Sequence, residues 1–170
     1  MGQPEYSFEP VTKADLPMLH QWLAGPHMRA HWGDADTELG LIVEDMDNPV
    51  IDMWIVVLDA PFAYIQDYPA HHWHMPHYAG FPKGTRAIDT FVGAPPYLNK
   101  GHASRFLRQH AQALMEKGYP AVVIDPSPEN TPAVRAYRNA GFSGDQIAPC
   151  EDGDPVLVLK YTGGRPDAHA

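Results

Sequence analysis

The segment Lys100-Gly101-His102-Ala103-Ser104 leads into a stretch with helical periodicity, and its composition suits a phosphate group. The start of a helix presents backbone N–H groups that lack intrahelical partners, together with the positive end of the helix dipole. Lys100 adds a positive charge beside these groups. An ordinary helix start has the same pattern, so the segment by itself permits a pyrophosphate site without establishing one.

A second chemical feature is the irregular stretch between Pro69 and Gly84, which is rich in histidine. It carries four imidazoles within seven residues, and neutral imidazole is a common ligand of Zn²⁺ and Ni²⁺. They are His71, His72, His74 and His77. Adjacent histidines on a loop often do not converge, and no carboxylate or cysteine lies inside the cluster. We therefore expect no metal and a loop that recognises substrate, in which Trp73 and Tyr78 stack on a sugar or cover a cation.

The hydrophobic pattern predicts the elements that must position these residues. Expected strands are 6–10, 51–58, 62–68, 86–92, 121–124 and 156–161. Expected helices are one from a capping box at Thr12 to a stop at Gly25-Pro26, and others at 37–46, 101–117 and 131–140. Strands interleaved with helices predict an α/β (α+β) fold, with a single layer of sheet and helices on both faces. We expect one domain over residues 1–162 and a flexible tail at 163–170.

Composition excludes several classes of partner. The net charge of −9 argues against nucleic acid and anionic membranes, since both require a positive face. It permits a cationic ligand, although acidity that serves only solubility explains it equally well. Cys150 is the only cysteine, so no intrachain disulfide can form, and we interpret it as incidental. No signal peptide and no long apolar run are present, which favours a cytoplasmic protein.

The most specific pattern lies downstream of the phosphate-type turn. The element Asp125-Pro126-Ser127-Pro128-Glu129-Asn130 precedes Ala133-Val134-Arg135-Ala136-Tyr137-Arg138-Asn139-Ala140-Gly141-Phe142. With the strand Ala87-Ile88-Asp89, these segments resemble the acetyl-CoA motif of the GNAT superfamily and the helix that follows it. They are most similar to the aminoglycoside 6′-N-acetyltransferase branch. The resemblance is specific from Ile88 to Phe142 and implies a mixed, mostly antiparallel sheet in one domain.

The resemblance implies acetyl-CoA as cosubstrate and no required metal. The cofactor pyrophosphate would lie on the amides of Lys100, Gly101, His102, Ala103 and Ser104. The pantetheine arm would pair with the backbone of Phe91 and Val92, and Asn130 would hold its far side.

The resemblance also implies two catalytic side chains. An amine must lose a proton before it attacks a thioester, and Asp89 matches the strand carboxylate that accepts this proton. Charged residues are rare in the middle of strands, and a buried, unpaired charge costs free energy. A charge at this position therefore favours a functional role for Asp89. Tyr137 matches the tyrosine that protonates the departing thiolate, although a packed aromatic residue is the alternative. A backbone N–H of the Phe91 strand would stabilise the developing oxyanion.

The predicted substrate side is less well determined. The candidate substrate-binding residues are Trp32, Gln66, Tyr68, Trp73 and Asp125. Asp125 before Pro126 can instead be a turn or cap residue, and Trp32 and Tyr68 can instead be core residues. The stretch from Pro69 to Gly84 contains no Asp or Glu, unlike the acidic clefts expected of enzymes that bind polycations.

These observations favour N-acetylation of a primary amine on a small cationic substrate such as an aminoglycoside. A related alternative is acetylation of a hydroxylamine or amine in siderophore biosynthesis, where His tends to replace the strand Asp. An alternative of another class is a non-catalytic acetyl-CoA or metal sensor, which would not need both Asp89 and Tyr137. The sequence leaves open a monomer or a homodimer.

Overall fold

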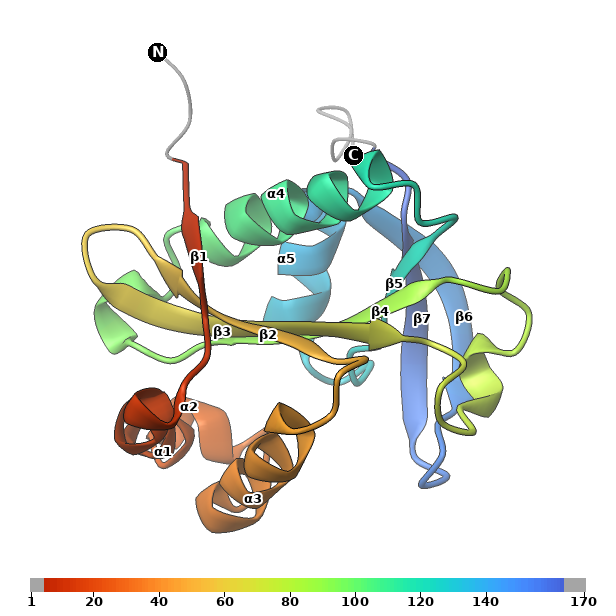
Figure 1. The fold of residues 1–170 in the computed structure, drawn as a ribbon. Helices are drawn as coiled ribbons and strands as arrows, with labels where there is room; N and C mark the ends of the chain where they lie inside the picture. Colours follow the sequence, from red (N-terminus) through yellow and green to blue (C-terminus); the bar gives the residue numbers. More distant parts are fainter. Residues whose placement is uncertain (1–4, 164–170) are drawn as a thin grey trace. The chain divides into compact units, whose positions relative to one another are not determined.

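The computed structural model describes residues 5–163, so that most of the tail predicted at 163–170 lies outside the described residues. Seven strands form one sheet in the order β1-β2-β3-β4-β5-β7-β6 (Figure 1). Of the strand pairs with a resolved register, only β4 with β5 is parallel within the described residues, and the others are antiparallel. The predicted mixed, mostly antiparallel fold is confirmed.

The chain divides into two compact units, each of which draws on two separate stretches of sequence. The first unit contains residues 1–67 and 90–100, and the second contains residues 68–89 and 101–170. Whether these units act as one domain, as the sequence predicts, stays a prediction. Between residues 5 and 163, no helix has the length and apolar character that crossing a membrane demands.

The first unit holds the amino-terminal helices and strands. They are β1 (Ser7–Pro10), η1 (Lys13–Asp15), α1 (Leu16–Leu23), α2 (Pro26–Arg29), α3 (Ala35–Met46), β2 (Asp52–Val57), most of β3 (Pro61–Pro69), the end of β4 (Arg86–Val92) and η3 (Pro95–Tyr97). The predicted capping contact forms, because the Thr12 backbone N–H donates to Asp15 Oδ2 at 2.8 Å. Leu19, Trp22 and Leu23 bury the apolar face of α1.

Pro26 has a second role that the sequence did not predict. The Gly25-Pro26 pair follows the end of α1 as expected, and Pro26 then begins the short helix α2. Proline fits the first helical position because that position needs no backbone N–H donor. The prediction that the pair only terminates a helix was therefore incomplete.

The second unit holds the carboxyl-terminal elements. They are the end of β3, η2 (Pro76–Tyr78), the start of β4, α4 (His102–Glu116), β5 (Val122–Ile124), α5 (Thr131–Ala140), β6 (Phe142–Pro149) and β7 (Pro155–Tyr161). Helices α4 and α5 lie side by side (Figure 1), and Phe106, Leu107 and Leu114 of α4 are buried.

The strand β6 was missed from the sequence. It is an edge strand whose pairing with β7 shifts register between Ser143 and Gln146, and most of its side chains are at least partly exposed. An edge strand with a bulge shows no clear alternation of apolar and polar residues, which removes the signal that sequence analysis uses.

Candidate active site

Two carboxylates lie at the same edge of the second unit's strands. In the parallel pair β4 and β5, Arg86 is opposite Val122 and Ala87 is opposite Val123. The ladder ends at Ala87 and Val123, and Asp89 and Asp125 each follow two residues further along the chain. The carboxyl ends of parallel strands point the same way, so both carboxylates follow the paired segment at the same end.

Tyr68, at the end of β3, interacts with both carboxylates. Its side chain is buried, and burial is the largest cause that raises the pKa of its hydroxyl well above the ordinary value. The charges of Asp89 and Asp125 raise the pKa further, and the hydroxyl donates a hydrogen bond to Asp89. The Tyr68 hydroxyl, a neutral donor, thus offsets part of the free energy that it costs to bury the Asp89 carboxylate in mid-strand.

Two more tyrosine hydroxyls belong to the same cluster. Burial raises the pKa of Tyr78 well above its ordinary value, and the charge of Asp125 follows as the next cause. Burial also raises the pKa of Tyr137, followed by the charges of Asp89 and Asp125. The Tyr137 residue as a whole is partly exposed. The hydroxyls therefore stay protonated at neutral pH, beside two negative charges.

His77 is the hydrogen-bond partner of Asp125. Its Nε2 lies 2.7 Å from Asp125 Oδ2, and its side chain has no exposed surface, while that of Asp125 is 18% exposed. The alternative of a turn or cap residue does not describe the Asp125 carboxylate, because its partner is a side chain 48 residues away in sequence. Sequence analysis had placed His77 in the histidine cluster, since no local signal indicates a partner so distant.

The histidine-rich stretch does not present its imidazoles as a group. His71 Nε2 donates to the Phe81 carbonyl oxygen at 3.0 Å, while His77 is turned to Asp125. Within residues 5–163, the one group with ligand atoms close enough for a metal ion is Cys150, Glu151 and Asp152, which includes no histidine.

Trp73 is the exposed aromatic residue of this stretch. It is 39% exposed, and its ring meets that of Tyr68 edge-on, with centroids 5.4 Å apart. It also meets His72 edge-on at 4.5 Å. The predicted substrate residues Trp73 and Tyr68 are therefore in contact, with Trp73 available at the surface and Tyr68 buried.

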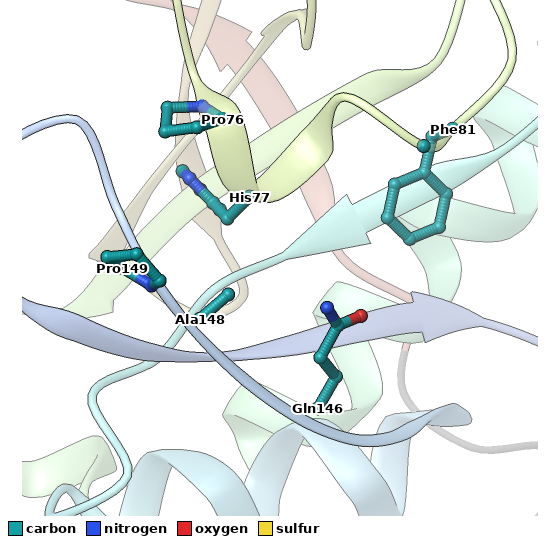
Figure 2. Close-up of a pocket in the computed structure, with 7 residues that line it drawn as sticks. Pro76, His77, Phe81, Gln146, Ala148 and Pro149 are labelled. Atoms are coloured by element: carbon teal, nitrogen blue, oxygen red, sulfur yellow. The ribbon is translucent and has the colours of Figure 1, made fainter.

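A shallow open pocket of about 380 Å³ lies between the η2 segment and β6 (Figure 2). Its lining residues are Pro76, His77, Gly80, Phe81, Gln146, Ala148 and Pro149. Neither Asp89 nor Tyr137 is among them, so this pocket is not the place where the two predicted catalytic groups meet.

The phosphate-type turn has the expected backbone. Gly101 precedes α4 with φ +80°, a conformation that favours glycine, and the helix begins at His102. The first amides of α4, including those of Ala103 and Ser104, are the donors that a helix start presents. The Ser104 hydroxyl is itself used within the protein, because it donates to the Ala136 carbonyl at 2.9 Å.

Arg105 is a cation at this turn that sequence analysis missed. A Cβ added to Gly101 would lie 2.9 Å from Arg105 Nη1, so the guanidinium covers the glycine, and Nη2 lies 3.5 Å from His102 Nδ1. The sequence feature that could have identified Arg105 is its position four residues after Gly101, on the first turn of the helix. Amide donors with a guanidinium beside them fit a pyrophosphate group.

Asn130 has a structural role that the sequence did not predict. It caps α5, and its side-chain oxygen accepts from the Ala133 backbone N–H at 3.3 Å. Its predicted contact with acetyl-CoA stays a prediction.

The remaining predicted residues belong to the first unit. The Phe91 ring is stacked on Tyr64 with centroids 5.3 Å apart, and it meets Trp32 edge-on at 5.0 Å. The Gln66 side-chain oxygen accepts from the Tyr64 hydroxyl. Trp32 and Gln66 thus have packing and hydrogen-bonding roles there, and their contact with substrate stays a prediction.

Two predicted cofactor contacts of the first unit differ in their surroundings. The Val92 carbonyl accepts from His27 Nε2 at 3.1 Å, so that oxygen already has a partner. Lys100 is exposed at the end of this unit, as a residue that attracts phosphate must be.

The second unit thus holds two carboxylates among buried tyrosine hydroxyls, and a helix start at α4 that follows a glycine and presents amide donors. The sequence profile described as acetyltransferase (GNAT) domain matches residues 11–148. The chain belongs to this acetyltransferase family, and it is an acetyl-CoA-dependent N-acetyltransferase.

Its relatives include enzymes that act on aminoglycosides. The aminoglycoside N(6')-acetyltransferase type 1 of Klebsiella pneumoniae is 26% identical over 164 residues, covering 88% of this chain and 80% of its own. A kanamycin resistance protein of Rhizobium radiobacter is 30% identical over 78 residues, covering 45% of this chain and 72% of its own. A solved structure of AAC(6')-Ib with ribostamycin and coenzyme A matches with a TM-score of 0.81 and 26% identity, covering 96% of this chain and 99% of that one.

Proposed function

We propose that this protein transfers the acetyl group of acetyl-CoA to a primary amine of a small cationic substrate of the aminoglycoside kind, in the cytoplasm. The observation that carries the proposal is the pair Asp89 and Asp125 among three protonated tyrosine hydroxyls in one unit. Carboxylates attract an ammonium group, and the net charge of −9 favours a cation over an anion as substrate. The names of the relatives at 25–30% identity support the same class of acceptor.

Each group in the cluster has a distinct part in the proposed reaction. Acetyl-CoA, held at the amides of the α4 start, supplies an acetyl group as a thioester. Asp125 attracts the substrate ammonium, and Asp89 accepts its proton, so that the neutral nitrogen attacks the thioester carbonyl carbon. The carbon–sulfur bond breaks, the thiolate that leaves takes a proton from the Tyr137 hydroxyl, and the second proton that the nitrogen loses on becoming an amide restores the Tyr137 hydroxyl. Burial and the nearby carboxylates raise the pKa of Tyr137, so its hydroxyl carries a proton at neutral pH.

The test is a thiol-release assay with acetyl-CoA and a panel of amines. The panel contains a kanamycin-type aminoglycoside, a polyamine, and hydroxylated lysine and ornithine derivatives. We expect release that depends on the aminoglycoside. Release with the hydroxylated amino acids alone would favour siderophore chemistry instead. Tight binding of acetyl-CoA without release by any amine would favour a sensor.

A matched pair of variants links release to the proposed base. Asp89→Asn removes the proton acceptor and keeps the size of the side chain, so we expect kcat to fall by at least about 100-fold. Asp59→Asn makes the same change at an exposed turn between β2 and β3 and leaves kcat unchanged. Equal rates for the two variants would contradict a catalytic Asp89.

A further inference from the structure

The residue that faces Asp125 from the buried side is His77. The imidazole has no exposed surface, whereas the Asp125 carboxylate keeps 18% of its own. The carboxylate therefore lies between an enclosed hydrogen-bond donor and the side from which a ligand reaches it. Its charge also acts on Tyr68, Tyr78 and Tyr137, which places it inside the cluster of the proposed site.

The local sequence gives Asp125 little other support. The next residue is Pro126, which has no backbone N–H to donate to a neighbouring carboxylate. Strand β5 ends at Ile124, so Asp125 itself stands outside the regular ladder. A carboxylate at such a position needs a donor from elsewhere if its direction is to be fixed, and Nε2 of His77 at 2.7 Å is such a donor, beside the Tyr78 hydroxyl.

The backbone that carries His77 is itself held in place. Pro76 begins η2, the Tyr78 backbone N–H donates to the Met75 carbonyl at 3.0 Å, and that of Ala79 donates to the Pro76 carbonyl at 3.2 Å. The His77 ring also lies against the Tyr78 ring, with centroids 4.1 Å apart. A fixed turn with a packed ring suits a residue whose purpose is to orient another side chain.

The second ring nitrogen indicates which proton His77 carries. Among the described residues, Nδ1 is buried and has no hydrogen-bond partner. A proton on Nδ1 would be a buried donor without an acceptor, so the favoured form has its single proton on Nε2, directed at Asp125. In this form the imidazole is neutral, and the carboxylate keeps its full charge and further lone pairs for a substrate cation.

We propose that His77 is a positioning residue, which orients the Asp125 carboxylate toward the cationic group of the acceptor without neutralising it. This inference rests on the proposed function, because it assigns Asp125 to amine binding. It assigns this role to His77 alone among the histidines of the stretch, because only its imidazole contacts Asp125 among the described residues. The relevant chemistry is the binding of an ammonium group, and not the transfer of the proton, so His77 acts on the KM of the amine.

The kinetic test uses two substitutions of His77 and one control. In His77→Gln the side-chain amide can still donate from the position of Nε2, while His77→Leu keeps bulk without a donor. We expect His77→Leu to raise the KM of the amine by about tenfold, the size of one hydrogen bond to a charged group, with kcat and the KM of acetyl-CoA unchanged. His77→Gln restores the KM to within about threefold of the original. His74→Leu, at an exposed histidine of the same stretch, has no effect.

A double variant shows whether His77 acts through Asp125. Asp125→Asn raises the KM of the amine by itself, and adding His77→Leu to it produces no further increase. Additive effects of the two substitutions would overturn the inference, as would a fall in kcat with no change in KM. If His77→Leu proves unfolded at the assay temperature, the Gln variant and the NMR measurement below decide the matter.

NMR of protein labelled with ¹⁵N at histidine separates this inference from the proposed function. We expect the His77 resonances to show a proton on Nε2 and none on Nδ1, and to shift in Asp125→Asn. A proton on Nδ1, or resonances that Asp125→Asn leaves unmoved, would overturn the inference even if the enzyme acetylates aminoglycosides. Conversely, absence of turnover with every amine would refute the proposed function, while the resonances still report on the pair.

Discussion

The two units use aromatic residues in opposite ways. In the first unit, Trp22, Trp32 and Tyr64 pack around Phe91, and the polar atoms nearby are paired internally. The Tyr64 hydroxyl donates to Gln66, and the Thr90 hydroxyl donates to the Tyr64 carbonyl at 2.7 Å. This cluster is a core with its hydrogen bonds satisfied.

In the second unit, the aromatic residues surround negative charge. The charges of Asp89 and Asp125 raise the pKa values of Tyr68, Tyr78 and Tyr137, and the buried Tyr78 hydroxyl also interacts with the Asp125 carboxylate as a hydrogen-bond donor. The comparison teaches that residue type alone does not separate packing from chemistry. Buried tyrosine hydroxyls beside two carboxylates mark the second unit as the place where a ligand is expected.

The largest effect is expected from a substitution that disrupts the packed aromatic cluster of the first unit. Phe91 is 6% exposed, and Phe91→Ala removes the ring against which three other aromatic rings pack. We expect a loss of about 3–5 kcal/mol in the free energy of unfolding. Urea denaturation measures it, and a loss below about 1 kcal/mol would mean that the cluster is not a core.

Tyr137→Phe tests the other cluster through activity. The substitution keeps the ring and removes the proton that we assign to the departing thiolate. We expect kcat to fall by about 100-fold while the midpoint of thermal unfolding stays near its original value. Steady-state kinetics with the best amine of the panel provides the measurement. An unchanged kcat would leave Tyr137 with a packing role only.

A matched pair of tyrosine substitutions compares the two clusters directly. Tyr64→Phe leaves the Gln66 side chain without the donor it accepts from, so we expect a loss of about 1–3 kcal/mol of stability. Tyr78→Phe removes a buried hydroxyl whose hydrogen-bond interaction with Asp125 is the smallest of the named causes that raise its pKa, so we expect a smaller loss, below about 1 kcal/mol. The reverse order of stability, measured by urea denaturation, would contradict the contrast between the units.

The raised pKa values predict how stability depends on alkaline pH. Each of Tyr68, Tyr78 and Tyr137 has a pKa above the ordinary value of about 10 in the folded state. Between the unfolded and the folded pKa, the folded state binds more protons, so stability falls as pH rises. The contribution is complete below about pH 10 and declines above it. Tyr78→Phe makes this decline smaller, and a decline of the same slope in that variant would contradict the assignment.

The strongest local patterns predicted the fold well. Strand β4 and helix α5 have the predicted bounds, and α4 differs from its prediction by one residue at each end. These segments are strongly periodic and end at Gly or turn residues, so local sequence decides them. The edge strand β6 and the short helix α2 depend on pairing and on the dual use of Pro26, which local periodicity does not record.

The candidate site was predictable where it follows a strand end or a motif. Asp89 and Asp125 each follow, by two residues, the paired segment of the parallel neighbours β4 and β5, a relation that the sequence analysis did not predict. The pairing of His77 with Asp125 joins residues far apart in sequence, and the capping role of Asn130 was hidden by its place in a family motif. Such contacts depend on the tertiary fold, so a single sequence does not reveal them.

The central claim is that Asp89 accepts a proton from a cationic amine acceptor. The most direct test measures thiol release from acetyl-CoA with a kanamycin-type aminoglycoside, in the original protein and in Asp89→Asn, after calorimetry has shown equal binding of acetyl-CoA. Release by the original protein, with a loss of at least about 100-fold in the variant, is the result that the account predicts. Equal release by both proteins would contradict it.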